Sequence, residues 1–345
     1  NISARSMWVG TFHSLAHRLL RMHWAEAKLP QNFQILDSDD QIRLLKRIMK
    51  TLDIDEKKWP ARQAAWFING QKDEGLRAHQ VPSGDDLFQI THKRIYQSYE
   101  EICDQGGLVD FAELLLRSHE LWLNDPSLLQ HYQQRFGHLL VDEFQDTNAI
   151  QYAWLRVLAG DRSRIMAVGD DDQSIYGWRG AKIENIHNFP QHFADVQTIR
   201  LEQNYRSTKN ILDAANGLIQ QNTDRLGKDL WSADGAGEPI KVYAGFNDLD
   251  EARFIVERIE QWLESGGNAD EVAVLYRSNA QSRVIEEALL RANIAYQIYG
   301  GQRFFERAEI KNALAYMRLI EDRHSDPAFE RVVNTPPRGI GDKSV

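Results

Sequence analysis

The chain has 345 residues, of which 42% are hydrophobic and 26% charged, and its formal net charge is −9. This composition is typical of a globular protein with room for two or three domains, and no apolar run approaches the roughly 18–20 residues that cross a bilayer. The single cysteine, Cys103, excludes an internal disulfide and a cysteine-rich zinc site. We therefore expect a cytoplasmic protein without a membrane segment, in which any nucleic acid binds to local basic and aromatic surfaces.

Both ends of the chain interrupt a structural element. Asn1 lies only a few residues before an apolar stretch at 7–10, and residues 337–345 are typical of a turn that nothing follows. We therefore expect the chain to be an internal fragment of a longer protein.

Residues 12–136 show helical periodicity almost throughout. Ser38 and Gln41 frame a predicted capping box, and an apolar stripe at helical spacing follows it. Further helices are predicted at 62–69, 87–103, 110–123 and 128–136. None of these helices carries an obvious catalytic constellation.

The pattern changes after Gly137, where strand-like runs alternate with helices. The predicted strands lie at 138–144, 164–170, 198–204, 240–246 and 271–277, and the predicted helices at 148–158, 208–221, 249–264 and 281–292. Such alternation predicts parallel sheets in an α/β protein. From Gly300 onward the pattern is helical again.

Asp142 and Glu143 directly follow a short apolar run. The carboxyl end of a parallel strand faces the crevice where open α/β sheets bind ligands. One carboxylate there can hold Mg²⁺, and the other can orient or deprotonate an attacking water. The alternative is a pair of acids at a helix N-terminus, with Asp146 and Thr147 as caps. Their position at the very end of the strand favours the metal–water site.

Such a pair is half of a nucleotide-hydrolysing site, and the other half is a phosphate loop of the form Gly-x-x-x-x-Gly-Lys-Ser/Thr. The 345 residues contain no such loop. The nearest string, Gly227-Lys228, is followed by Asp229 in place of Ser or Thr. The sequence therefore predicts a strong half-site without its partner.

A second polar loop, residues 168–180, follows the predicted strand at 164–168. Gln173 on this loop could reach a γ-phosphate or its attacking water, and Tyr176 and Trp178 could stack on bases. The alternative is a solvated acidic turn followed by core aromatics. Asp170 to Asp172 could also suggest a two-metal nuclease, but no additional Glu-Lys cluster supports that interpretation.

Three weaker signals lie elsewhere in the chain. Arg206 stands just before a predicted helix start, where a phosphate could bind, although a surface arginine is the commoner case. Thr11 and His13 begin another predicted helix and could contact a nucleic-acid backbone. Polar residues at 276–279 follow the predicted strand at 271–277.

Taken in chain order, these strings resemble the ordered motifs of superfamily 1A DNA helicases of the UvrD, Rep and PcrA type. The strings are Val-Gly-Thr-Phe-His at 9–13, Val-Asp-Glu-Phe-Gln-Asp-Thr at 141–147, Val-Gly-Asp-Asp-Asp-Gln-Ser-Ile-Tyr-Gly-Trp-Arg-Gly at 168–180, Leu-Glu-Gln-Asn-Tyr-Arg-Ser at 201–207 and Leu-Tyr-Arg-Ser-Asn-Ala-Gln-Ser-Arg at 275–283. The resemblance covers essentially the whole chain, and chance occurrence of this series in this order is negligible.

The resemblance implies an α/β fold of two RecA-like P-loop NTPase lobes, with ATP bound between them and a helical insertion in each lobe. Residues 1–11 and 137–202 would belong to the first lobe, and 12–136 would be its insertion. Residues 203–299 would be part of the second lobe, and 300–345 would begin the second insertion. Both lobes would be incomplete.

The resemblance also assigns the nucleotide site. It implies that Asp142 binds Mg²⁺, that Glu143 activates the attacking water, and that Gln173 couples the γ-phosphate to lobe closure. Tyr205 would pack near the ATP, and Arg206 would reach its phosphates.

A further set of residues would contact DNA. In the family pattern, aromatic side chains stack on single-stranded bases, polar side chains touch the strand, and a glycine-rich hairpin grips the duplex backbone. The corresponding residues are Tyr176 and Trp178 for stacking, Thr11, His13, Arg277 and Asn279 for the strand, and Gly339, Ile340 and Gly341 for the hairpin.

The implied activity is that of an ATP-dependent 3′-to-5′ DNA helicase that unwinds duplex DNA in excision repair, mismatch repair and replication. Its partners would be single-stranded DNA, single/double-strand junctions, repair proteins and further copies of the chain. The family's phosphate loop would precede Asn1, and its transition-state arginine would follow Val345, so we expect this chain alone to be inactive. The alternative is a non-catalytic DNA-binding module descended from a helicase.

Overall fold

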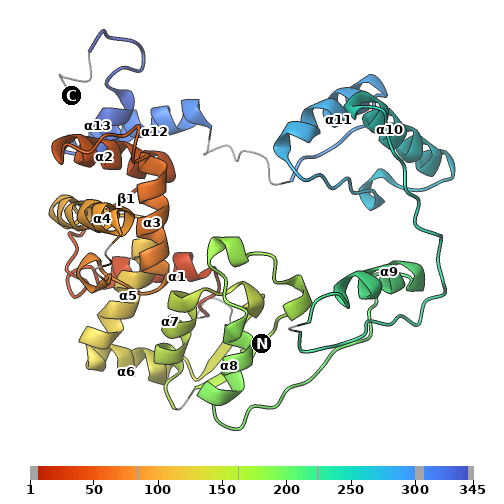
Figure 1. Ribbon diagram of the computed structural model, residues 1–345, viewed down its shortest axis with the longest axis horizontal. Coiled ribbons are helices and arrows are strands. Elements are labelled where there is room, and N and C mark those ends of the chain that lie inside the picture. The colour runs from red at the N-terminus through yellow and green to blue at the C-terminus, as the bar shows by residue number, and fades with distance from the viewer. Residues whose placement is uncertain are drawn as a thin grey trace. The chain divides into compact units, whose positions relative to one another are not determined.

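A computed structural model describes residues 7–82, 84, 86–161, 163–223, 225–299 and 307–340 (Figure 1). The chain divides into two compact units, one made of residues 1–202 with 218–229 and the other of residues 203–217 with 230–345. Each unit has hydrophobic clusters of its own. In the described part of the chain, no helix combines the length and apolar character needed to cross a membrane.

Helices dominate the first 136 residues, as the periodicity predicts. They are α1 (Phe12–Met22), α2 (Ser38–Thr51), α3 (Ala61–Asp73), α4 (Leu87–Gly106), α5 (Phe111–Asn124) and α6 (Pro126–Arg135), with a 3-10 turn η2 (Ala78–Gln80). Two short strands, β1 (Gln34–Ile35) and β2 (Leu108–Val109), pair in parallel.

The predicted capping box at Ser38 is wrong by one residue. Asp37 is the N-cap of α2, and its side chain accepts the N–H of Asp40 at 2.8 Å. Aspartate caps a helix as well as serine does, so the helix starts one residue earlier than the capping-box pattern indicates.

The central element of the first unit is a parallel pair of strands, β3 (His138–Val141) and β4 (Arg164–Ala167), in the register Val141↔Ala167. The helices α7 (Ala149–Ala159) and α8 (Glu184–His192) follow the strands, with the 3-10 turns η3 (Phe144–Asp146), η4 (Asp171–Gln173) and η5 (Gly177–Arg179) in the loops (Figure 1). Val141 and Ala167 face the core, whereas Leu140 and Met166 on the other face are exposed. This alternation is the period of two expected of a strand.

Two large clusters form the core of the first unit. One joins α1 and α5 to α7 and the end of β3, around buried residues such as Leu115, Trp122 and Trp154. The other lies within residues 36–108 and packs α2, α3 and α4 around residues such as Ile68 and Tyr96. The helices of 12–136 therefore contribute both to the core beneath β3 and to a core of their own.

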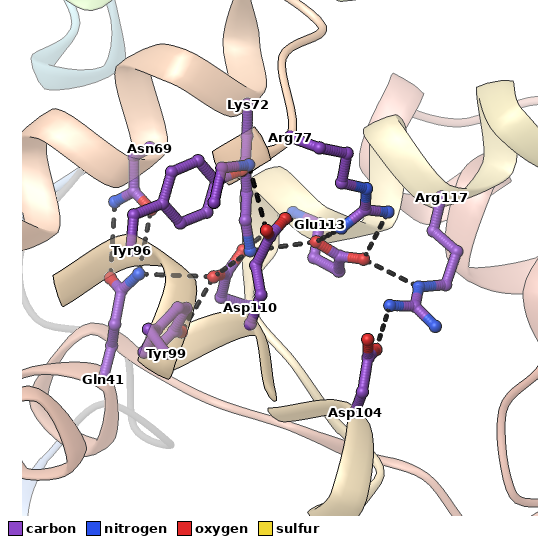
Figure 2. Close-up of polar contacts among 12 residues, drawn as sticks. Gln41, Asn69, Lys72, Arg77, Tyr96, Tyr99, Asp104, Asp110, Glu113 and Arg117 are labelled. Carbon is purple, nitrogen blue, oxygen red and sulfur yellow. Dashed lines mark hydrogen bonds and ion pairs between the residues drawn. The ribbon is translucent and has the colours of Figure 1, made fainter. Parts of the chain in front are cut away.

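A network of ion pairs is buried among α3, α4 and α5 (Figure 2). Lys72 on α3 contacts Asp110 at 2.7 Å and Glu113 at 2.9 Å, and all three side chains are at least 96% buried. Glu113 also forms ion pairs with Arg77 and Arg117. Because burying a charge is costly unless it is paired, this network fixes the three helices in one register.

The helices of the second unit pair locally. They are α9 (Lys209–Ile219), which begins in this unit, α10 (Asp248–Glu264), α11 (Asn279–Arg291), α12 (Ala308–Glu321) and α13 (Asp326–Val332), with a 3-10 turn η6 (Ala269–Glu271). Val256, Ile259 and Leu289 are buried between α10 and α11, and a second small cluster lies between α12 and α13. The predicted helix at 249–264 is thus confirmed, and Gly266 follows its end with φ +92°.

Three predicted strands are wrong. The structure describes residues 198–204, 240–246 and 271–277 and places no strand in them, apart from a single bridge between Gln203 and Trp231. Their apolar side chains are largely solvent-exposed, as at Val242 (93%) and Leu275 (95%). An extended segment becomes a strand only when a neighbour satisfies its backbone groups along its length, and a single bridge at Gln203 does not do so.

Candidate nucleotide and DNA site

The parallel register brings the two polar loops of the first unit to the same edge of the sheet. The N–H of Val168 donates to the carbonyl of Val141 at 2.8 Å, and the N–H of Phe144 donates to the carbonyl of Val168 at 2.9 Å. The residues after β3 therefore leave the sheet beside those after β4, which is the ligand-binding edge of an open α/β sheet.

Asp142 and Glu143 are both exposed at this edge. Glu143 adopts a left-handed conformation, with φ 49° and ψ 45°, which is uncommon for a residue other than glycine. Its N–H donates to Oδ1 of Asp142 at 3.0 Å. The exposed carboxylate of Asp142 fits Mg²⁺, which usually takes one or two carboxylates together with water and phosphate oxygens.

The alternative role as helix caps is not what the structure shows for this segment. Asn148 is the N-cap of α7. Its side-chain oxygen accepts the N–H of Gln151 at 3.0 Å, and the side-chain oxygen of Gln151 accepts the N–H of Asn148 at 2.9 Å. Asp146 and Thr147 therefore do not cap this helix. Burial and the nearby Glu143 raise the pKa of Asp146.

Gln145 connects the two strand ends. Its amide nitrogen donates to Oε2 of Glu143 at 2.7 Å, and its amide oxygen accepts the N–H of Asp170 at 3.0 Å. The side chain is fully enclosed, and a Cβ at position 169 would lie only 2.8 Å from its oxygen. Gly169 therefore leaves the space that this bridge occupies.

The bridge continues to Gln173. Nε2 of Gln173 donates to Oδ2 of Asp170 at 2.7 Å. Hydrogen bonds thus link Glu143 to Gln145, Gln145 to the backbone of Asp170, and the side chain of Asp170 to Gln173 across the edge of the sheet. The structure brings Asp142, Glu143 and Gln173 into one region, as the sequence predicts.

The three aspartates at 170–172 approach one another closely enough to hold a metal ion, with ligand atoms within 4.8 Å. Two of them are paired with cations instead: Asp172 with Arg225 at 2.6 Å, and Asp170 with Lys228. Burial raises the pKa of Asp170. Hydrogen bonds from the side chains of Lys228 and Gln173 have the larger combined effect and hold this pKa below its usual value. This charge neutralisation disfavours the two-metal nuclease interpretation.

The predicted stacking residues share a cation between them. The ring centroids of Tyr176 and Trp178 lie 6.5 Å apart, and the guanidinium of Arg179 lies 4.7 Å and 4.6 Å from them. Trp178 is 71% exposed. The two rings are tilted by 52°, and a group of aromatic rings around a guanidinium suits bases and phosphates together.

Thr11 and His13 lie at the start of α1. Thr11 is its N-cap and accepts the N–H of Ser14 at 3.3 Å. His13 packs its ring edge against Phe111, and burial lowers the pKa of His13. The DNA contact predicted for Thr11 and His13 stays a prediction.

The residues assigned to the second unit are exposed. Tyr205 is 81% exposed and donates its hydroxyl to Gln203 at 2.8 Å. Oδ1 of Asn204 accepts the N–H groups of Arg206 and Ser207, both at 2.8 Å. The role of Tyr205 and Arg206 in binding ATP stays a prediction.

Arg277 and Asn279 lie at the start of α11, with both side chains exposed. Oε1 of Gln281 accepts the N–H groups of Arg277 and Ser278 at 3.0 Å each, so the backbone of this turn is fixed. The DNA contact predicted for them is untested.

Gly339 and Ile340 form a turn in which Gly339 has φ +70°. Oδ1 of Asn334 accepts the N–H of Ile340 at 3.2 Å, and the Arg338 guanidinium donates to the carbonyl of Val332 at 2.6 Å. Gly341, the third residue of the predicted duplex-gripping hairpin, lies outside the described residues.

Several residues of this site have no role in the sequence-based interpretation. Gln145 and Arg179 lie inside the motifs that carry the family resemblance, and this position could have indicated a role in the site. Their contacts, however, depend on the fold. Arg225 and Lys228 lie far along the chain from the aspartates that they contact, and no local pattern indicates the pairing.

Residues 1–194 match the UvrD/REP helicase N-terminal domain, and residues 199–345 match the UvrD-like helicase C-terminal domain. DNA helicase II of Escherichia coli (strain K12) is 65% identical over 343 residues, which are 99% of this chain and 48% of that protein. DNA helicase II of Haemophilus influenzae is 60% identical over 98% of this chain and 46% of its own. The ATP-dependent DNA helicase PcrA of Leuconostoc citreum is 43% identical over 99% of this chain and 46% of its own. The chain spans about half the length of these relatives, and it belongs to the UvrD-like DNA helicase family.

Proposed function

We propose that the chain carries part of the motor of an ATP-dependent 3′-to-5′ DNA helicase that unwinds duplex DNA in excision repair, mismatch repair and replication. The observation that carries the proposal is the hydrogen-bonded chain from Glu143 through Gln145 and Asp170 to Gln173, at the sheet edge of a UvrD-like protein. It joins a water-activating carboxylate to an amide that can sense a phosphate.

The proposed chemistry uses the roles that the family resemblance implies for these side chains. Asp142 would hold Mg²⁺, and Mg²⁺–ATP supplies the phosphoanhydride bond that hydrolysis breaks. Glu143 would orient the attacking water and accept its proton, while Gln145 keeps the carboxylate turned toward the β4 loop. Gln173 would donate to the γ-phosphate, and Arg206 would neutralise phosphate charge.

The DNA side of the proposal rests on the group formed by the half-buried Tyr176 and the exposed Trp178 and Arg179. Single-stranded bases would stack on Trp178, and Thr11, His13, Arg277 and Asn279 would contact the strand. Single/double-strand junctions are the proposed substrate, with repair proteins and further copies of the chain as proposed partners. A cytoplasmic location also stays a prediction.

We predict that the 345-residue chain alone shows no DNA-stimulated ATP turnover, because its sequence contains no phosphate loop. The measurement is phosphate release with and without oligothymidylate. ATP turnover that Glu143→Gln abolishes would contradict this prediction.

We predict that Trp178→Ala weakens binding of oligothymidylate about 5- to 150-fold, because stacking contributes about 1–3 kcal/mol per base. Fluorescence anisotropy of a labelled strand measures this loss. Trp66→Ala is the matched control, because Trp66 on α3 is equally exposed (74%) and lies outside the proposed strand path. Equal losses in both variants would contradict the stacking role.

A second candidate function is a non-catalytic DNA-binding module descended from a helicase. The reading frame upstream of the Asn1 codon separates the two candidates. An in-frame Gly-x-x-x-x-Gly-Lys-Thr supports the motor, whereas a start codon without that string supports the module.

A further inference from the structure

We propose that Arg225 and Lys228 are positioning residues for Gln173. Their ion pairs with Asp172 and Asp170, called the grip below, hold the turn η4 that contains this glutamine. The proposal rests on the proposed function of Gln173 and adds two residues to the machinery around it.

The segment 225–228 engages every carboxylate of the acidic turn. Arg225 donates to both oxygens of Asp172, from Nε at 2.8 Å and from Nη2 at 2.6 Å. Lys228 pairs with Asp170, and the N–H of Leu226 donates to Asp171 at 2.6 Å. Three successive contacts to three successive side chains fix the turn at several points along its length.

The side chains of these ion pairs are partly buried. The side chains of Arg225 and Asp172 are 14% and 13% exposed, and those of Lys228 and Asp170 are 16% and 24% exposed. Bidentate, partly buried pairs hold their geometry better than exposed pairs, which contribute little. The Lys209–Asp213 pair on α9 is an exposed counterpart, at 62% and 56%.

The grip reaches Gln173 through Asp170. One carboxylate oxygen of Asp170 contacts Lys228 and accepts the N–H of Asp172, and the other accepts Nε2 of Gln173 at 2.7 Å. Without Lys228, only the N–H of Asp172 would hold that oxygen, and the acceptor of the Gln173 amide would be fixed less firmly. The N–H of Asp170 also binds Gln145, so the same anchor supports the bridge to Glu143.

The gripping segment is itself preorganised. Arg225 donates to the carbonyl of Lys228 at 2.9 Å, and Arg200 donates to the carbonyl of Gly227 at 3.1 Å. In the sequence, the segment follows α9, which begins shortly after Arg206.

The test is hydrogen exchange of the 345-residue protein, followed by mass spectrometry. In the double variant Arg225→Gln/Lys228→Met, we expect the amides of 172–174 to exchange about tenfold faster, because the turn opens locally. Exchange in α7 should stay unchanged. Lys209→Met, which removes the exposed pair on α9, is the matched control and should change neither region.

Unchanged exchange at 172–174 would overturn the proposal, and so would an equal acceleration in α7. If the double variant does not fold, the charge swap Asp172→Arg/Arg225→Asp decides. Restored protection of 172–174 in the swap, compared with Arg225→Asp alone, supports the grip, and its failure overturns it. Because exchange is measured without nucleotide, a failed ATPase proposal leaves this result standing.

Discussion

Asp73, the last residue of α3, is a carboxylate whose protonation changes near neutral pH. Burial raises its pKa to about 6, although a hydrogen bond from Asn148 at 3.0 Å opposes the shift and the nearby acids Asp110 and Glu74 add to it. Asn148 is the N-cap of α7. The protonation of Asp73 therefore affects the hydrogen bond that joins the end of α3 to the start of α7.

The raised pKa predicts a pH-dependent stability. The folded state favours protonated Asp73, so its stabilising contribution is complete below the ordinary value of 3.8 and is lost as the pH rises through about 6. Asp73→Asn cannot ionise and should gain about 1–3 kcal/mol relative to the wild type between pH 4 and pH 7.

Urea unfolding at the two pH values measures this difference. Glu56→Gln, which removes an exposed pair with Lys46 in the same unit, is the control and should follow the wild type. If Asp73→Asn and wild type lose stability in parallel from pH 4 to pH 7, the raised pKa is wrong.

Single residues also show how far the sequence predicts the site. Asp142 and Glu143 are recognisable because an acidic pair at a strand end is a local pattern. The bridging role of Gln145 depends on the amide of Asp170, which comes from another strand end, and on the space at Gly169. Such contacts become visible only when the register of β3 and β4 is known.

At the scale of elements, the helices were more predictable than the strands, because only two of the five predicted strands, those at 138–144 and 164–170, contain a strand of the structure. The apolar stripe and the cap that define α2 or α10 lie within the helix itself, so a window of sequence contains the whole signal. A strand depends on a partner elsewhere in the chain. β3 and β4 supply each other with one, whereas the segment 240–246 has the composition of a strand but no neighbour in the described residues.

The ionic network between α3, α4 and α5 is the element-scale feature with the largest expected effect on stability. Glu113 is buried and receives Lys72, Arg77 and Arg117. Burial raises the pKa of Glu113, but the three cations outweigh it and hold the pKa far below its usual range. Glu113 is therefore ionised in the folded protein at every ordinary pH.

We predict that Glu113→Gln lowers the free energy of unfolding by about 3–5 kcal/mol, because it leaves buried cations without their shared partner. Urea unfolding followed by circular dichroism measures the loss. Glu287→Gln, in an exposed pair with Arg283, should cost less than about 1 kcal/mol. A loss of that small size in Glu113→Gln would show that the network is not strongly coupled to folding.

At the scale of the whole molecule, the two units differ in how much core they contain. The first has two extended clusters with many fully buried side chains, whereas the clusters of the second hold three buried residues each among the described residues. The motifs that the structure brings together, around Glu143 and Gln173, all belong to the first unit.

We predict that the chain unfolds in two steps, with the second unit opening at the lower urea concentration, because it buries less apolar surface. Hydrogen exchange should show stronger protection in α5 and α7 than in α10 and α11. A single cooperative transition with uniform protection would contradict the division into two independent units.

The left-handed backbone of Glu143 has a consequence for which amino acids the position tolerates. A β-branched side chain in that conformation is strained by sterics alone, whereas glycine, asparagine and aspartate are admitted. In a library of all substitutions at this position, valine, isoleucine and threonine should lower protein yield, whereas glycine and asparagine should leave the yield unchanged. The mutational tolerance of this position is thus limited by backbone geometry as well as by chemistry.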